Sequence, residues 1–143
     1  MGPRSWPSFV PTNDSYAYLD TSAFVKLCWP EPESDALHGY LRSWPLRVSA
    51  ALLWTETLRA VQRQPVARVE RAQRLLQLIP LLEVDRPLFR QAGLLGPSHI
   101  RSLEAIHIAT AMSLGPDLGV LITYEERMAS AATLYGLPVA SPS

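Results

Sequence analysis

The sequence predicts an α/β protein: a three-layer α/β/α sandwich in which helices cover both faces of a short parallel sheet. Short apolar runs alternate with helical patterns along the chain, which is the order expected when helices connect parallel strands. The 143 residues are enough for one domain with a core of its own. Ligands of such folds bind at the carboxyl ends of the strands, so functional residues are expected there.

The first half of the chain predicts two short strands, each followed by helices. Apolar runs mark the strands, and capping residues or prolines mark where the helices begin and end. The expected elements are a strand at 16–20, a helix capped by Thr21 and Ser22 and ended by Pro30, a helix at 34–41, a strand at 46–49, a helix at about 50–63 capped by Ser49, and a helix from Pro65 to about 78.

The second half predicts three more strands, of which residues 119–123 (GVLIT) form the clearest one in the chain. Thr123 and Glu126 match a capping box at the start of the next helix. The expected elements are a strand at 81–84, a helix at 87–95, a helix from 103 to about 114 capped by Ser102, a strand at 119–123, a helix at 124–135 and a strand at 138–140.

Residues 1–15 predict a flexible tail, which leaves residues 16–143 as the folded domain. The segment holds three prolines and lacks the apolar stretch of a signal peptide or a membrane span. Cys28 is the only cysteine, so no internal disulfide and no zinc-binding spacing is available, which fits a cytoplasmic protein. Its apolar neighbours predict a buried structural thiol.

The charged residues balance, but the basic ones are almost all arginine. The formal net charge is zero, so composition alone does not indicate a nucleic-acid partner. Five arginines nevertheless fall within sixteen positions, where they could follow RNA phosphates or form a solvated face or a dimer edge. They are Arg59, Arg63, Arg68, Arg71 and Arg74.

Two acids of the first half stand where an ordinary structural role explains them only partly. Asp20 ends an apolar strand, where it either caps the following helix or takes part in chemistry. Glu56 falls on the apolar side of its expected helix, where an acid is costly unless a partner or a metal ion holds it. An ion pair with Arg59 or Arg63 is the alternative.

Two further acids come from the second half. Glu104 falls in the first turn of its expected helix, where the helix dipole alone would favour a negative charge. Three residues later, His107 is more often a packing or hydrogen-bonding residue than a metal ligand. Because Glu126 is assigned to the capping box, Glu125 is left as the candidate for chemistry.

Taken together, these four acids indicate a divalent-metal site. Four carboxylates in one cleft would repel one another unless a hard cation with oxygen ligands, Mg²⁺ or Mn²⁺, held them. Such a cation activates water and neutralises charge on a phosphodiester. Histidine and cysteine are too scattered for a zinc hydrolase, and no glycine-rich phosphate loop is present.

Four segments resemble the signature segments of PIN-domain ribonucleases, most closely the VapC toxins of bacterial toxin–antitoxin pairs. The segments are residues 18–23 (YLDTSA), Glu56, residues 102–110 (SLEAIHIAT) and residues 121–128 (LITYEERM). The resemblance runs from about residue 16 to residue 140. It implies an α/β/α sandwich, RNA cleavage that depends on Mg²⁺ or Mn²⁺, and a VapB-type antitoxin that blocks the site.

The resemblance also implies roles for individual residues. Asp20 and Glu56 match the first two family acids, and Ser22 and Thr123 match polar positions that help to hold water and phosphate. The third and fourth acids are usually aspartate in the family, whereas this sequence has glutamate. The resulting hypothesis assigns catalysis and metal binding to Asp20, Glu56, Glu104 and Glu125, with Ser22, Thr123 and Arg101 in support.

The function predicted from the sequence is therefore a cytoplasmic, metal-dependent endoribonuclease toxin that acts on RNA, binds an antitoxin and forms a homodimer. The alternative is a catalytically weak or inactive PIN fold that serves as a protein-binding module. A phosphatase with Asp20 as nucleophile is disfavoured, because such sites need a downstream lysine and Lys26, the only lysine, lies too close in sequence.

Overall fold

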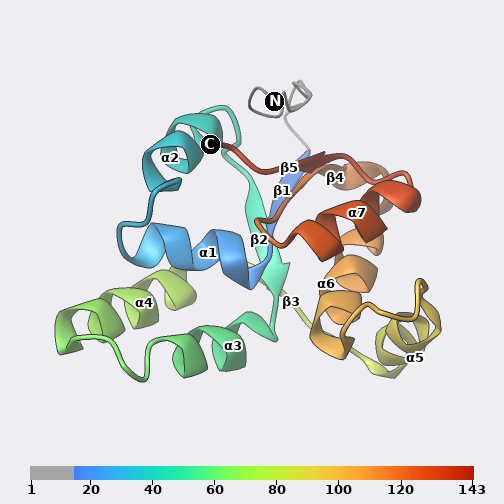
Figure 1. Ribbon diagram of the computed structural model, residues 1–143, viewed down its shortest axis with the longest axis horizontal. Helices are drawn as coiled ribbons and strands as arrows, with labels where there is room; N and C mark the ends of the chain where they lie inside the picture. The colour runs from blue at the N-terminus through green and yellow to red at the C-terminus, as the bar shows by residue number, and fades with distance from the viewer. Residues whose placement is uncertain (1–14) are drawn as a thin grey trace.

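A computed structural model describes residues 15–143 and shows one five-stranded parallel sheet with the strand order β3-β2-β1-β4-β5. Figure 1 shows α1 to α4 on one side of this sheet and α5 to α7 on the other, as the predicted α/β/α sandwich requires. The strands are β1 (Tyr16–Leu19), β2 (Arg47–Ala50), β3 (Leu81–Leu82), β4 (Leu118–Ile122) and β5 (Val139–Ala140). The helices are α1 (Thr21–Cys28), α2 (Ser34–Leu41), α3 (Leu53–Ala60), α4 (Val66–Leu78), α5 (Arg86–Leu94), α6 (Ser102–Met112) and α7 (Glu126–Leu134).

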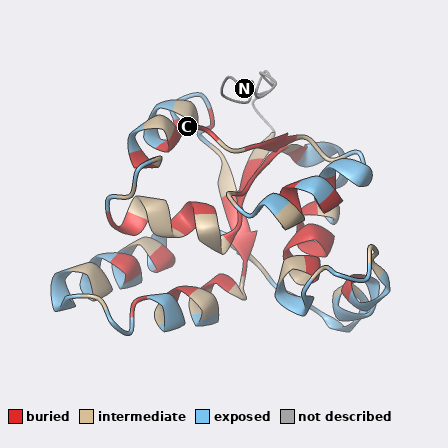
Figure 2. Cartoon of the chain, in the orientation of Figure 1, coloured by how far each residue is buried: buried red, intermediate tan, exposed pale blue. Residues whose placement is uncertain are grey.

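The core lies on both faces of the sheet because successive strand residues point to opposite sides. Leu19 of β1 and Ile122 of β4 pack with residues of α1 and α2. On the other face, Tyr18 and Leu121 pack with residues of α6 and α7. Figure 2 shows buried residues along the strands and on the inner sides of the helices, with exposed residues outside.

The register between the two central strands decides which residues meet at the edge of the sheet. Leu19 of β1 pairs with Ile122 of β4, so the residues that follow, Asp20 and Thr123, are neighbours at the carboxyl ends of these strands. The backbone N–H of Asp20 donates to the carbonyl of Ile122 at 3.2 Å, which fixes this alignment.

The strands and helices are found where the sequence predicts them, but their caps are not. Asp20 caps α1, which confirms the capping role considered for it, whereas Thr21 and Ser22 lie within the helix. Arg101, rather than Ser102, stands at the N-cap of α6. Glu125 is the N-cap of α7 and Glu126 its first residue, so the predicted capping box of Thr123 with Glu126 is wrong.

Ser49 also has another role than the predicted one. Its hydroxyl donates to the carbonyl of Leu19 at 2.6 Å, and α3 begins only at Leu53. The side chains of Ser49 and Thr123 therefore make long-range hydrogen bonds where local capping was expected, because both lie at the buried ends of central strands.

The remaining general predictions concern the thiol, the membrane and the tail. Cys28 is buried as predicted, and burial raises the pKa of its thiol to about 12. In the part of the chain that the structure describes, no helix is long and apolar enough to cross a membrane. The predicted tail, apart from Ser15, lies outside the described residues.

Candidate active site

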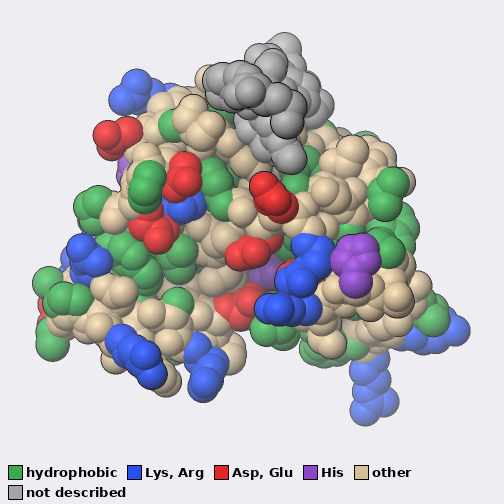
Figure 3. Space-filling view, viewed as in Figure 1, with side chains coloured by type: hydrophobic (Ala, Val, Ile, Leu, Met, Phe, Trp, Pro, Cys, Tyr) green, Lys and Arg blue, Asp and Glu red, His purple; other side chains and the backbone are tan. Residues whose placement is uncertain are grey.

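A pocket of about 520 Å³ opens at the carboxyl ends of β1 and β4, between α1 and α3 on one side and α6 and α7 on the other. Figure 3 shows Asp and Glu side chains gathered at the centre of this face of the molecule, with Lys and Arg beside them. All four predicted acids line the pocket, and so do Ser22 and Arg101. The other lining residues are Thr21, Val25, Arg59, Ala60, Ser102, Leu103, His107 and Met128.

Asp20 lies at the floor of the pocket and is only 2% exposed. Its Oδ1 accepts hydrogen bonds from the Ser22 hydroxyl at 2.7 Å and the Ala23 backbone N–H at 2.9 Å. Its Oδ2 accepts one from the Thr123 hydroxyl at 2.6 Å. Burial raises the pKa of Asp20 even though these donors lower it. Asp20 is therefore the cap of α1. It is also a buried carboxylate, whose negative charge a bound cation would stabilise.

Ser22 and Thr123 donate hydrogen bonds to Asp20, whereas the role in holding water and phosphate that the resemblance implied stays a prediction. The Ser22 hydroxyl also accepts a hydrogen bond from the backbone N–H of Tyr124 at 2.9 Å, which ties α1 to the loop after β4. Thr123 is fully buried, and its hydroxyl accepts from the N–H of Glu125 at 3.1 Å. Both hydroxyls thus hold Asp20 against the segment that carries Glu125.

Glu56 faces the pocket from α3, with its side chain 19% exposed. Its partners are neither Arg59 nor Arg63, so the alternative of an ion pair with one of these arginines is wrong. Oε1 instead accepts from Thr21 and pairs with Nε2 of His107, each at 2.6 Å. Burial alone would raise the pKa of Glu56, but the hydrogen bonds from His107 and from Thr21 lower it.

Glu104 is engaged with an arginine that the sequence analysis did not single out. Its Oε1 lies 2.7 Å from a terminal nitrogen of Arg127, and its Oε2 accepts from Arg127 Nε at 3.3 Å and from the Arg101 N–H at 3.1 Å. Burial would raise the pKa of Glu104, but these donors outweigh it and lower the pKa. Glu104 is thus a paired carboxylate at the start of α6, as the helix-dipole alternative foresaw in part.

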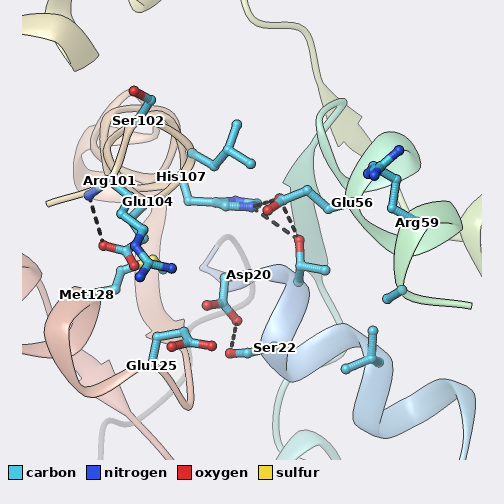
Figure 4. A pocket seen from close by; sticks show the side chains of 14 residues that line it. Asp20, Ser22, Glu56, Arg59, Arg101, Ser102, Glu104, His107, Glu125 and Met128 are labelled. Atoms are coloured by element: carbon cyan, nitrogen blue, oxygen red, sulfur yellow. Dashed lines mark hydrogen bonds and ion pairs between the residues drawn. The ribbon is translucent and has the colours of Figure 1, made fainter.

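Glu125 differs from the other three acids in its exposure and its lack of hydrogen-bond donors. It is exposed, and among the described residues its carboxylate accepts no hydrogen bond. Figure 4 shows it beside Asp20, with Glu56 and Glu104 on opposite sides of them. Glu126 is exposed as well but does not line the pocket. The structure therefore places the predicted member of this pair at the site.

Three polar residues that contact the acids of the pocket were not predicted to do so from the sequence; Thr21 and His107 line the pocket, and Arg127 does not. Thr21 and His107 hold Glu56, and Arg127 holds Glu104. For His107 the sequence favoured a packing or hydrogen-bonding role, which the structure confirms. Of the five clustered arginines, only Arg59 lines the pocket. Arg59 and Arg63, the members of this cluster nearest to Glu56 in the sequence, do not pair with it.

The donor set suits a hard divalent cation, although the side chains are not gathered around one position. Within residues 15–143, no three Asp, Glu, His or Cys side chains stand together as a ready-made metal site. The four acids nevertheless offer only oxygen donors, which Mg²⁺ and Mn²⁺ prefer. Buried Asp20 and unpaired Glu125 fit such an ion directly, and Glu56 keeps Oε2 without a hydrogen bond among the described residues.

Comparison with known proteins identifies close relatives. The family model described as "PIN domain" matches residues 17–134. The chain is 48% identical over 126 residues to Ribonuclease VapC46 of Mycobacterium tuberculosis, covering 88% of this chain and 97% of that protein. It is 36% identical over 131 residues to Ribonuclease VapC47 of the same species, covering 87% and 96%.

Two solved structures share the fold. One is VapC20 of Mycobacterium tuberculosis, described as a sarcin–ricin loop cleaving toxin, with a TM-score of 0.66 and 19% identity over 82% of this chain and 95% of that one. The other is a chain of a toxin–antitoxin complex from Klebsiella pneumoniae, with a TM-score of 0.66 and 20% identity over 89% and 98%.

Proposed function

This chain belongs to the PIN-domain family, among relatives named VapC ribonucleases, and we propose that it is an endoribonuclease toxin that hydrolyses RNA with the help of a divalent cation. One observation carries the proposal: acids from four separate segments line one pocket at the carboxyl ends of the central strands. PIN-domain ribonucleases generally depend on a divalent metal. We propose Mg²⁺ or Mn²⁺, because every acidic donor here is a carboxylate oxygen.

The residues of the pocket would have three roles: binding the cation, orienting Asp20 and contacting RNA phosphates. Asp20, Glu56 and Glu125 would hold the cation, and Glu104 would join them after leaving Arg127. The bound cation would polarise the scissile phosphate and lower the pKa of an attacking water. Ser22 and Thr123 keep Asp20 oriented through hydrogen bonds of 2.7 and 2.6 Å. Arg59 and Arg101 line opposite parts of the pocket, where they would contact RNA phosphates.

The partners follow from the same relationship. A toxin–antitoxin complex among the structural neighbours supports a VapB-type antitoxin as a protein partner. The predicted homodimer and the cytoplasmic location are kept as part of the proposal; the single free cysteine, Cys28, suits a reducing compartment.

One observation favours the alternative of a weak or inactive PIN fold that binds a protein. Glu104 is already paired with Arg127, so one of the four acids is not available to a cation in this arrangement. The deciding experiment is cleavage of a mixed RNA pool with Mg²⁺ or Mn²⁺, with and without EDTA. Cleavage that EDTA abolishes supports the nuclease, provided that Asp20→Asn protein purified in the same way is inactive. Absence of cleavage with either ion would favour the binding module.

We expect Mn²⁺ to support faster cleavage than Mg²⁺ at equal concentration. Glutamate at positions 104 and 125 is longer than the usual aspartate, and Mg²⁺ demands stricter octahedral geometry. The double variant Glu104→Asp with Glu125→Asp should narrow the Mn²⁺/Mg²⁺ rate ratio, and its effect should differ from the sum of the single variants. The measurement is cleavage rate against metal concentration for all four proteins. One common ratio would show that these glutamates do not set the metal preference.

We expect Arg59 and Arg101, rather than the clustered arginines outside the pocket, to set the salt dependence of RNA binding. Each phosphate contact on a single strand adds about 0.7 to the slope of log affinity against log salt. Replacing both residues by alanine should therefore flatten the slope by about 1.4. Binding is measured by fluorescence anisotropy in EDTA on the Asp20→Asn background, which prevents cleavage. The matched control is Arg63→Ala with Arg74→Ala, two exposed positions outside the pocket; an equal effect there would contradict the prediction.

A further inference from the structure

One wall of the pocket is a polar network whose members come from four elements. His107 of α6 is 3% exposed and contacts Glu56 of α3, Thr21 of α1 and Tyr18 of β1. The Tyr18 and His107 rings meet edge to face, with their centroids 5.8 Å apart and their planes at 77°. A buried histidine held at both ring nitrogens has one defined orientation.

The hydrogen-bond donors of this network can be assigned from its chemistry. Tyr18 is fully buried, and its phenol is a hydrogen-bond donor. That phenol lies 2.7 Å from Nδ1 of His107 and can donate to it. With Nδ1 accepting, Nε2 carries the ring proton and donates to Oε1 of Glu56 at 2.6 Å. The Thr21 hydroxyl donates to the same oxygen at 2.6 Å.

His107 and Thr21 therefore both donate to Oε1 of Glu56, and Oε2 has no hydrogen-bond partner among the described residues. A glutamate side chain has three rotatable bonds, so an unheld carboxylate would sample several orientations. Carboxylates that bind metal ions are themselves commonly fixed by such hydrogen bonds.

We propose that His107, oriented by Tyr18, is a positioning residue that commits Oε1 of Glu56 and thereby presents Oε2 to the divalent cation. The inference rests on the proposed function, because it assumes that Glu56 is a ligand. It adds that the metal affinity depends on two side chains that need not touch the metal or the RNA.

The test is binding of Mn²⁺ alone to the RNA-free protein, measured by titration calorimetry. His107→Leu, which keeps the bulk but removes both ring nitrogens, should weaken Mn²⁺ binding by about 10–100-fold. His107→Gln, whose amide can still donate to Glu56, should recover most of this loss. Tyr18→Phe should fall between His107→Gln and His107→Leu, because the ring stays but its orientation is less fixed.

A structural role for His107 predicts a different pattern. The matched control is Ile108→Val, which alters the neighbouring buried residue of α6 without touching Glu56. It should lower the unfolding temperature in EDTA and leave the Mn²⁺ affinity unchanged. Equal losses of affinity in Ile108→Val and His107→Leu, or no loss in His107→Leu, would overturn the inference while the proposed function stands. A parent protein that binds no Mn²⁺ would overturn both.

The tautomer gives a second readout that needs neither metal nor RNA. Nitrogen-15 NMR of the metal-free protein should show the His107 proton on Nε2, and Tyr18→Phe should disturb this signature. A proton on Nδ1, alone or together with one on Nε2, would overturn the assignment of Tyr18 as the group that orients the ring.

Discussion

Replacing Asp20 by asparagine is expected to reduce RNA cleavage by about 10²–10³-fold and to leave the protein folded. The loss corresponds to about 3–4 kcal/mol of transition-state stabilisation, which is the scale expected when a metal-assisted site loses a central charge. Asp20 is the most buried of the four acids, and its two oxygens receive three hydrogen bonds. Glu104 also receives three hydrogen bonds, but its side chain is 12% exposed.

The fold should survive because the substitution removes a charge that burial disfavours. The asparagine carbonyl of the variant can still accept from Ser22 and from the Ala23 N–H, and its amide can turn to Thr123. Since burial raises the pKa of Asp20, the metal-free folded state takes up a proton at a higher pH than the unfolded state does. The parent should therefore gain stability from this group as the pH falls through the folded pKa towards the unfolded value of about 3.9.

The variant should lack that gain. The measurement is the free energy of unfolding in urea and EDTA for parent and Asp20→Asn, compared as a difference at each pH, so that the contributions of Glu56 and Glu104 cancel. The difference should favour the variant most at neutral pH and shrink as the solution becomes acidic. Full cleavage by folded Asp20→Asn protein would refute the site assignment, and a variant that is less stable at neutral pH would refute the electrostatic argument.

Much of this site could be predicted because it follows from the order of elements. Asp20 and Thr123 each follow an apolar run in the sequence, and parallel pairing of those runs brings their ends together. Glu56 and Glu104 lie on helices that start near the same edge. The pattern of apolar and acidic residues along the chain thus specifies which carboxylates share the pocket.

The partners of those carboxylates could not be predicted in the same way. Glu56 pairs with His107, 51 positions away, and Glu104 pairs with Arg127, 23 positions away. Local rules instead favoured Arg59 or Arg63 for Glu56, since Arg59 lies three residues further along the helix and Arg63 one turn beyond it. Tertiary packing determines which of several plausible donors pairs with each carboxylate, and a single sequence does not show how the helices pack.

The helix caps failed for a related reason. A cap depends on the backbone angles of one or two residues at a helix start, and those are set by where the preceding strand ends. The Thr123 hydroxyl donates to buried Asp20 and does not cap a helix. The helix α7 therefore begins at Glu126, with Glu125 in an extended conformation at its N-cap. This later start of α7 places Glu125 at the pocket and leaves Glu126 outside it.

The later start of α7 makes Glu125 and Glu126 a matched pair. Glu125→Gln is expected to reduce cleavage by about 10–100-fold, the range seen when a metal site loses a supporting or ligating group. Glu126→Gln is expected to stay within about twofold of the parent, because a single exposed charge near the site contributes little through solvent. Both substitutions remove one negative charge, and both act at the exposed start of α7.

The comparison separates ligation from general electrostatics. The two residues are adjacent and exposed, and both face the positive end of the same helix dipole, so long-range effects on the cation or on RNA are similar for both. They differ in that only Glu125 lines the pocket, beside Asp20. Cleavage rates are measured across a range of Mn²⁺ concentrations. A loss in Glu125→Gln that high Mn²⁺ reverses identifies a ligand, whereas equal losses in both variants would mean that the start of α7 acts only through its charge.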